Sequence, residues 1–253
     1  GELTERGEND EPALELLERI RAERAQLVKQ KKAKAPKGGE SVIERRADGS
    51  VWEKRGKGEW VDITEEIPFD IPVEWEWARI SSVAISVRGS GIKKTEVTKS
   101  GEPCVRYGEL YTTYDHEVRE VRSHTSDGVY DSAKKLHIGE VLMTLTGENN
   151  IDIGRAIVNE TGRTIAYGGD LLALTGQWVD GRFLMYAMNS DYLGKQRTAA
   201  ATGDIIVHLS AAKVDDFLIA VPSIQEQQRI VAKLEETLPM VERLVEITEK
   251  DAA

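Results

Sequence analysis

Two long segments without glycine, one near each end of the sequence, place the strongest constraint on the fold. Residues Ala13–Lys34 are rich in strong helix formers, and their apolar side chains recur at steps of three and four residues. Residues Ile224–Lys250 show the same periodicity, and Pro239 is expected to kink or divide that helix. A helix of about 22 residues is about 33 Å long, which is too long for a small domain to cover fully.

Each helix therefore needs a partner for its apolar stripe. The two helices could pack flat on the central domain, project from it as an antiparallel pair, or pair with another chain. We predict the antiparallel pair, with contacts through stripes that contain Leu17, Ile20, Leu27, Ile230, Leu234 and Val241.

Between the helices, short apolar runs alternate with turns that contain glycine. Runs such as EVLMTLTG, GRAIVNE and DLLALTG predict strands, and DGRFLMYAMNSDYLGKQRT predicts one helix with Asp180 as its N-cap. A series of strands with few helices indicates an α+β fold with a mixed or antiparallel sheet. We expect a spacer helix over 1–37, a linker or hairpin around Asp48-Gly49 over 38–71, the main domain over 72–222 and a second spacer helix over 223–253.

The composition limits the partners and the compartment. The net charge of −10 argues against non-specific adhesion to DNA or to an anionic membrane, although only −2 of it falls within residues 78–220. A single cysteine, Cys104, cannot form an internal disulfide. The sequence has no apolar run of about 18 residues, as a membrane span needs, and no signal-like N-terminus. We expect a soluble cytoplasmic protein without a membrane partner.

The sequence offers no recognisable catalytic constellation. It lacks the glycine spacing of phosphate-binding loops and the GxSxG turn of serine hydrolases, and its four histidines are scattered. We therefore expect no catalytic residue, no metal site and no bound cofactor, and we favour a binding protein over an enzyme.

Polar side chains concentrate in the turns of the middle region, as a DNA-reading domain requires. Lysine and arginine can hold phosphates, whereas Asn149, Asn150, Tyr107 and Gln196 are the better candidates for base contacts. Ordinary turns have a similar composition, so the turns alone leave both interpretations open. The candidate DNA-binding residues are Arg88, Lys93, Lys94, Arg106, Tyr107, Lys134, Lys135, Thr146, Gly147, Asn149, Asn150, Lys195, Gln196, Arg197 and Thr202.

Several segments resemble the specificity subunits of type I restriction-modification systems. ITEEIPFDIPVEWEWARISSVA is similar to the start of their target recognition domains, and KKLHIGEVLMTLTG followed by IGRAIV resembles the central strands and the threonine–glycine turn. VPSIQEQQRIVAKLEETL resembles the Pro-x-x-x-Glu-Gln-x-x-Ile-Val start of a conserved helix. The segments GELTERG and NDEPALELLERIRAERAQLVKQKKAK look like parts of the conserved helical regions, so the resemblance covers nearly the whole chain.

The resemblance implies a non-catalytic subunit that reads double-stranded DNA. A complete subunit has two target recognition domains and two helical spacers that hold two modification (methyltransferase) subunits, and a restriction subunit can join. S-adenosylmethionine, ATP and Mg²⁺ belong to those partners. This chain has room for one recognition domain, so it is either a natural half-size subunit, which could form a homodimer through its helices, or one half of a longer protein. The alternative is a protein-interaction module, such as an anti-restriction decoy that binds modification subunits.

Overall fold

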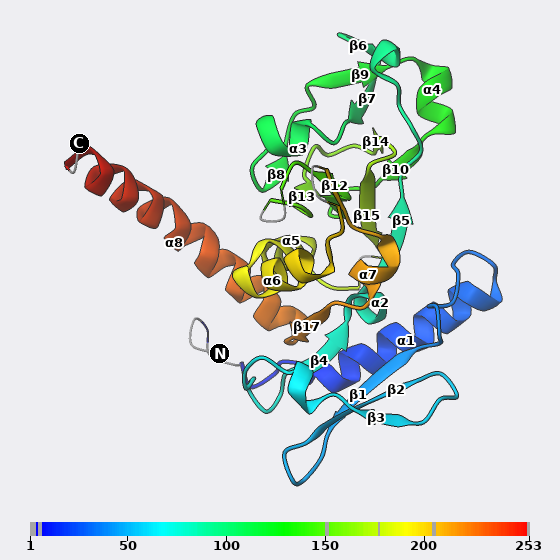
Figure 1. Cartoon of the computed structure of the whole chain (residues 1–253), viewed down its shortest axis with the longest axis vertical. Helices are drawn as coiled ribbons and strands as arrows, with labels where there is room; N and C mark the ends of the chain where they lie inside the picture. The colour runs from blue at the N-terminus through cyan, green and yellow to red at the C-terminus, as the bar shows by residue number, and fades with distance from the viewer. Residues whose placement is uncertain (1–3, 5–6, 150–151, 177, 204–205, 252–253) are drawn as a thin grey trace.

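A computed structural model describes residues 4, 7–149, 152–176, 178–203 and 206–251 (Figure 1). The fold is α+β, as predicted, with several sheets and long helices near both ends of the chain. Among the described residues, no helix combines the length and the apolar character needed to cross a membrane.

Helix α1 (Ala13–Lys29) packs along the main domain with one apolar face. Leu16 and Ile20 are fully buried in the largest core cluster, and the helix ends five residues earlier than predicted. Arg24 occupies the next position of the stripe and is also buried. Its guanidinium donates to the carbonyl oxygens of Ser81 and Ala84, at the C-terminal end of the one-turn helix α2 (Ile80–Val83). Arg24 thus supplies partners for orphan carbonyls that a leucine would leave unpaired.

Residues 38–71 form more than a linker. Strands β1 (Ser41–Arg45), β2 (Val51–Arg55) and β3 (Trp60–Asp62) make a three-stranded antiparallel sheet, followed by the 3₁₀ turn η1 (Thr64–Glu66). The predicted hairpin at Asp48-Gly49 joins β1 to β2. The outer face of this sheet carries Trp52, whose ring lies 3.7 Å from the guanidinium of Arg46.

The main domain begins and ends on paired strands. Strand β4 (Glu76–Arg79) runs antiparallel to β17 (Leu218–Val221), so the two ends of the domain are joined. The indole of Trp75 donates to Glu226 over 3.0 Å. The adjacent Gln227 accepts from the Asp180 backbone N–H and donates to the Pro222 carbonyl. Glu226 and Gln227, which carry the family resemblance, therefore join the start of the C-terminal helix to the residue before β4, to Asp180 and to the residue after β17.

Two five-stranded sheets form the domain itself. In the first sheet the order is β5-β15-β11-β13-β8, and in the second it is β10-β14-β7-β9-β6. The β13–β8 and β14–β7 pairs are parallel and the others are antiparallel. The strands of the first sheet are β5 (Ile85–Arg88), β15 (Leu171–Thr175), β11 (Val141–Thr144), β13 (Ala156–Asn159) and β8 (Glu117–Val118). Those of the second are β10 (Lys134–Leu136), β14 (Ile165–Tyr167), β7 (Glu102–Val105), β9 (Ser123–Thr125) and β6 (Val97–Thr98).

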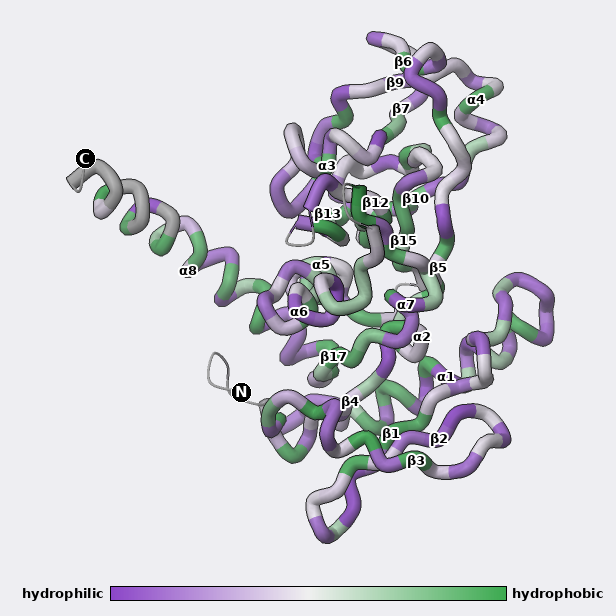
Figure 2. The backbone as a smooth tube through the Cα atoms, viewed as in Figure 1, coloured by the Kyte–Doolittle hydropathy of each residue, from purple (hydrophilic) through white to green (hydrophobic). Residues whose placement is uncertain are grey.

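The central strands of the first sheet are buried on both faces. Along β11, Val141 and Met143 belong to the core cluster shared with the helices, whereas Leu142 belongs to the cluster shared with the second sheet. Strand β15 divides in the same way, with Leu172 on one side and Leu171 on the other. This double burial explains the continuous apolar runs seen in the sequence, and Figure 2 shows these segments inside the domain.

Helices cover one side of the first sheet. The predicted single helix is divided into α5 (Gly181–Asn189) and α6 (Asp191–Ala200), and the Ser190 hydroxyl caps the second. Asp180 caps α5 by accepting from the Phe183 backbone N–H, as predicted. The remaining short elements are η2 (Lys94–Glu96), α3 (Glu109–Thr112), α4 (Asp127–Ser132), α7 (Ala211–Asp215) and the strand pair β12 (Thr146–Gly147) with β16 (Val207–His208).

Helix α8 (Ile224–Asp251) continues through Pro239 and leaves the body on the side opposite α1 (Figure 1). The predicted antiparallel pairing with α1 is not confirmed. Of the stripe residues, Ile20 is buried in the domain core, and Leu17, Leu27 and Ile230 pack against that same core. Leu234 is half-buried, whereas Val241 is exposed on the projecting half. Flat packing on the central domain, the first alternative above, describes α1 and the beginning of α8.

A buried ion network joins the three-stranded sheet to the main domain. The carboxylate of Glu53 on β2 accepts hydrogen bonds from Arg79 at 2.7 Å, Arg55 at 2.8 Å and the Ser41 hydroxyl at 2.6 Å. Burial alone would raise the pKa of Glu53, but these donors outweigh it and lower the pKa to about 2. Glu53 therefore stays charged while it is buried.

We predict that Glu53→Gln destabilises the protein by about 3 kcal/mol at pH 7, since a lowered pKa is worth about 1.4 kcal/mol per unit. The contribution of Glu53 is complete above its ordinary pKa of 4.5 and is lost as the pH falls through the folded value of about 2. The difference in unfolding free energy between wild type and variant, measured with urea from pH 7 down to pH 2, should therefore shrink with acid. Glu59→Gln, on the exposed turn before β3, is the matched control. A difference that does not change with pH would contradict the assignment.

Candidate nucleic-acid interface

The loop after β5 holds the first group of predicted cations. Gly89 lies so close to Gly168 that a Cβ at Gly89 would stand 1.9 Å from the Gly168 carbonyl oxygen, so only glycine fits there. Arg88 donates through Nε to the Gly169 carbonyl over 3.0 Å, and its side chain is 66% exposed. Lys93 and Lys94 follow on the same loop, and both are exposed.

Lys134 joins this loop from β10. Its backbone N–H donates to the Ser90 hydroxyl over 3.1 Å, and its side chain is exposed. The structure therefore brings Arg88, Lys93, Lys94 and Lys134 together, although they come from two distant parts of the sequence.

An aromatic segment continues from the loop. The Gly168 N–H donates to the Val105 carbonyl over 3.1 Å. This hydrogen bond places Arg106 and Tyr107 next to the glycine pair Gly168-Gly169. The ring of Tyr107 is 40% exposed and stands almost perpendicular to that of Tyr111, with 6.5 Å between the centroids. Exposed tyrosine next to arginine is suited to contact with bases and phosphates.

The threonine–glycine turn, Thr146-Gly147, is the last member of a row of loops that begins at Arg88 and continues through Tyr107. The Tyr111 hydroxyl lies 2.7 Å from Thr144 Oγ1 and 3.0 Å from the Thr146 carbonyl, and burial raises the pKa of Tyr111. The strand pair β12–β16 sets Thr146 beside His208, with 3.4 Å between the Thr146 hydroxyl and the His208 ring nitrogen. Thr202 bridges to His208 through two backbone hydrogen bonds. His208 was not predicted, because its place depends on a strand pairing between segments 60 residues apart.

The side chain of Asn149 is already engaged within its own turn. Its amide donates to the Asp152 carboxylate over 2.8 Å and accepts from the Asp152 backbone N–H. A base contact by Asn149 would have to replace these bonds. Asn150 lies outside the described residues, and Gly147 is buried in the turn, where a Cβ would stand 3.2 Å from the Tyr111 hydroxyl.

Three predicted residues have structural roles instead. Gln196 faces β17, donating to the Leu218 carbonyl and accepting from the Leu218 N–H, both over 2.9 Å, so a base contact by Gln196 would have to replace these bonds. The Lys135 ammonium donates to the carbonyls of Tyr130 and Ala133 around the end of α4, which occupies it. Arg197 is 6% exposed, so little of its side chain reaches the outer surface. Lys195 is exposed on α6.

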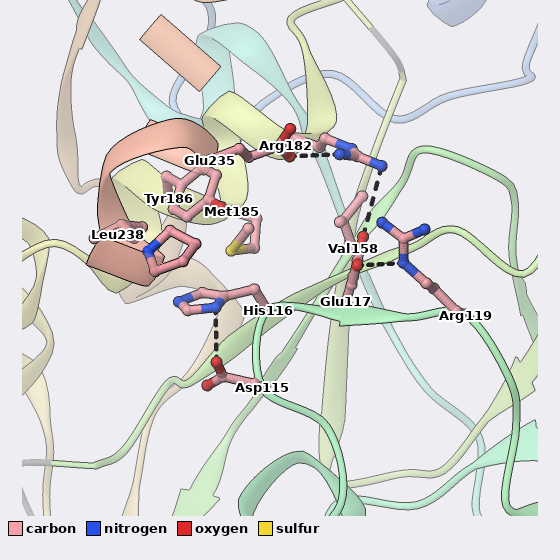
Figure 3. Close-up of a pocket in the computed structure, with 11 residues that line it drawn as sticks. Asp115, His116, Glu117, Arg119, Val158, Arg182, Met185, Tyr186, Glu235 and Leu238 are labelled. Atoms are coloured by element: carbon pink, nitrogen blue, oxygen red, sulfur yellow. Dashed lines mark hydrogen bonds and ion pairs between the residues drawn. The ribbon is translucent and has the colours of Figure 1, made fainter. Parts of the chain in front are cut away.

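A pocket of about 390 Å³ lies where α8 meets the main domain (Figure 3). At its rim Arg182 pairs with Glu160 over 3.1 Å, with Glu117 over 3.5 Å and with Glu235 on α8. Hydrogen bonding to Glu160, more than any other contact, raises the pKa of Arg182. This network joins α5, the first sheet and α8, so it fixes the direction in which α8 leaves the domain. Among the described residues, no group of three histidine, cysteine or acidic side chains is arranged to hold a metal ion.

Comparison with known proteins identifies similar sequences and similar folds. No family model matches the sequence. Among curated proteins, the chain is 22% identical over 254 residues to the type I restriction enzyme EcoEI specificity subunit of Escherichia coli, and 27% identical over 263 residues to the EcoAI specificity subunit. Each alignment covers 96% of this chain but only 39% and 38% of the relatives, so the chain spans about two fifths of their length.

Solved structures share the fold. An HsdS subunit from Thermoanaerobacter tengcongensis superimposes with a TM-score of 0.53 at 22% identity, over 71% of this chain and 41% of that one. A chain from a structure of type I R-M complex assembly and conformational transition gives a TM-score of 0.55 at 21% identity, over 73% and 43%. The fold is thus one shared with type I specificity subunits. The resemblance predicted from the sequence is confirmed, since the chain is similar over 96% of its length to two type I restriction enzyme specificity subunits.

We predict that Gln196→Ala lowers the unfolding free energy by about 2 kcal/mol, because it leaves both the N–H and the carbonyl of Leu218 without their side-chain partner. The neighbouring exposed Lys195, changed to alanine, should shift it by less than about 0.5 kcal/mol. Chemical denaturation of both variants tests this. Equal unfolding free energies of the two variants would show that the two hydrogen bonds between Gln196 and Leu218 contribute nothing to stability.

Proposed function

We propose that this chain is the DNA-reading half of a type I specificity subunit and that it recognises one part of a bipartite sequence in double-stranded DNA. The observation that carries the proposal is the continuous row of loops at the surface of the recognition domain. It runs from Arg88 through the glycine pair to Tyr107 and on to Thr146, each step joined by a hydrogen bond or ring contact.

The row has the composition that such a surface needs. Arg88, Lys93, Lys94 and Lys134 are exposed and Arg106 is half-buried, and these cations come from separate loops, so they can follow the phosphates of two strands. Its tyrosines and threonines can contact base edges or sugars. The acids of the long helices lie on other parts of the chain, away from this row. We assign phosphate contacts to Arg88, Lys93, Lys94, Arg106 and Lys134, and sequence reading to the segment around Tyr107 and Thr146.

The projecting half of α8 supplies the partner surface. Met240, Leu244 and Ile247 are 58%, 65% and 56% exposed, and Figure 2 shows apolar patches along this part of the helix. An apolar stripe on a solvated helix indicates a missing protein partner. We propose that modification subunits, or a second copy of the chain, cover it. Methylation with S-adenosylmethionine, and any ATP-driven step of a restriction subunit, belong to those partners.

The proposal is tested by selection from a pool of random duplexes. The chain and its modification subunit are mixed with the pool, the retained DNA is separated by electrophoretic mobility, and the bound fraction is sequenced. We expect enrichment of a motif in which a contiguous block of about three to five base pairs depends on this chain. A pool without enrichment, despite complex formation, would favour the alternative of a protein-interaction module that only occupies modification subunits.

Charge reversal in the first loop should weaken DNA binding without unfolding the domain. For Lys93→Glu with Lys94→Glu we expect at least about tenfold lower affinity and a salt dependence shallower by about two in log–log slope, since each lost phosphate contact removes about 0.9. The double variant Lys32→Glu with Lys34→Glu, just after α1, makes the same change in net charge on exposed residues outside the row. If both variants lose affinity equally, net charge and not this loop determines binding.

A further inference from the structure

Arg197 is a buried cation without an acceptor. It is 6% exposed, and its Nε and Nη1 atoms have no hydrogen-bond partner among the residues that the structure describes. Of the other buried arginines, Arg24 leaves its Nε without a partner but donates to two carbonyls, and Arg79 is paired with Glu53 and Glu66. A guanidinium that is buried without acceptors for its N–H groups is destabilising, so this site is incomplete without an anion.

Arg197 lines a pocket of about 210 Å³. The pocket lies between α5 and α6 on one side and two loops on the other and is open to solvent, with Asp115, His116, Asp152, Arg155, Asn189 and Arg197 as its lining. Both acids are already engaged. Asp115 lies 2.7 Å from Arg155 and 2.9 Å from His116, and Asp152 accepts from the amide of Asn149. The two carboxylates and the two arginines of the lining have equal and opposite formal charge, so the case for an anion rests on the Nε and Nη1 donors of Arg197, which have no acceptor among the described residues.

The pocket shares a wall with the row of loops. Gly154 has a φ of 80°, and a Cβ there would stand 2.4 Å from Arg197 Cδ, so glycine lets the loop lie directly on the arginine stem. The Gly154 N–H donates to Thr144 Oγ1 over 3.0 Å, and the same hydroxyl contacts Tyr111. Arg197 thus lies behind the turn whose front carries Thr146 and Asn149.

We propose that this pocket binds a phosphate group through Arg197, with Arg155 as the second cation, and that the phosphate belongs to the backbone of the recognised DNA. The identity of this phosphate rests on the proposed function, whereas the pocket's affinity for phosphate does not. A guanidinium presents several N–H donors in a planar fork, which matches the oxygens of a phosphate. The DNA strand would then pass the edge of the loop row and place one phosphate into the pocket.

The test uses Arg197→Met, which keeps much of the aliphatic stem and removes the charge, with Arg45→Met on the exposed end of β1 as the matched control. Thermal unfolding is followed in inorganic phosphate and in chloride at equal ionic strength. Phosphate should raise the midpoint of wild type and of Arg45→Met by about 2–4 °C at roughly tenfold excess over its dissociation constant. Arg197→Met should show no such shift and, without phosphate, should be at least as stable as wild type, because an uncompensated buried charge has been removed.

A second arm identifies the source of the phosphate. If the ligand is the DNA backbone, Arg197→Met makes the salt dependence of DNA binding shallower by about 0.9 in log–log slope. An unchanged slope together with a lost phosphate shift would assign the pocket to free phosphate. If wild type binds no DNA but keeps the phosphate shift, the proposed function fails and the phosphate pocket stands. The inference is overturned if phosphate stabilises Arg197→Met as much as wild type, if wild type shows no shift, or if Arg197→Met unfolds in chloride at a much lower temperature than wild type.

Discussion

The central strands of the first sheet are buried on both faces, and the rest of the structure depends on this. Its strands divide their side chains between two cores, one shared with the helices and one with the second sheet. A strand whose every side chain packs has none left to meet a ligand. The proposed recognition must therefore come from the loops at the strand ends, with Arg88 at the end of β5, Arg106 after β7 of the second sheet and Thr146 after β11. The rigid sheet fixes the positions of those loops relative to one another, which is what reading a sequence requires.

Arginine side chains join elements that lie outside the first sheet to one another and to the main domain. Arg24 joins α1 to the end of α2, Arg79 joins the three-stranded sheet to β4, and Arg182 joins α8 to α5 and the first sheet. Each has carboxylates or carbonyls around it, so each stabilises a joint between elements distant in sequence. Arg197 has the same burial without that environment. Because the other three arginines have acceptors and Arg197 lacks them at two of its nitrogens, we treat Arg197 as part of a binding site and not as a residue that joins two elements.

The sequence was sufficient to predict the fold class and several of the helices, strands and turns. The α+β fold, the start of α1, the cap at Asp180 and the turn at Asp48-Gly49 follow from periodicity and local chemistry, and the structure has them all. Periodicity shows that a face is buried but not what buries it. The stripe on α1 therefore predicted a helical partner, whereas the main domain itself covers Leu16 and Ile20. Strand order and the two parallel pairs depend on long-range contacts that no local pattern contains.

The candidate site was predictable in its chemistry and not in its geometry. Lysine, arginine and glutamine have the same capacity wherever they occur, but the fold decides which of them are already satisfied. Gln196 and Lys135 spend their donors on backbone carbonyls, whereas Lys93 and Lys94 remain exposed. The net charge of −10 likewise does not predict whether one surface of the chain can bind DNA. Screening limits the reach of a surface charge to about 10 Å, so a phosphate at the loop row meets the local cations and not the acids of the helices. A few phosphate contacts on an acidic chain give weak binding, and we therefore expect the partner subunits to contribute much of the affinity while this surface contributes the choice of sequence.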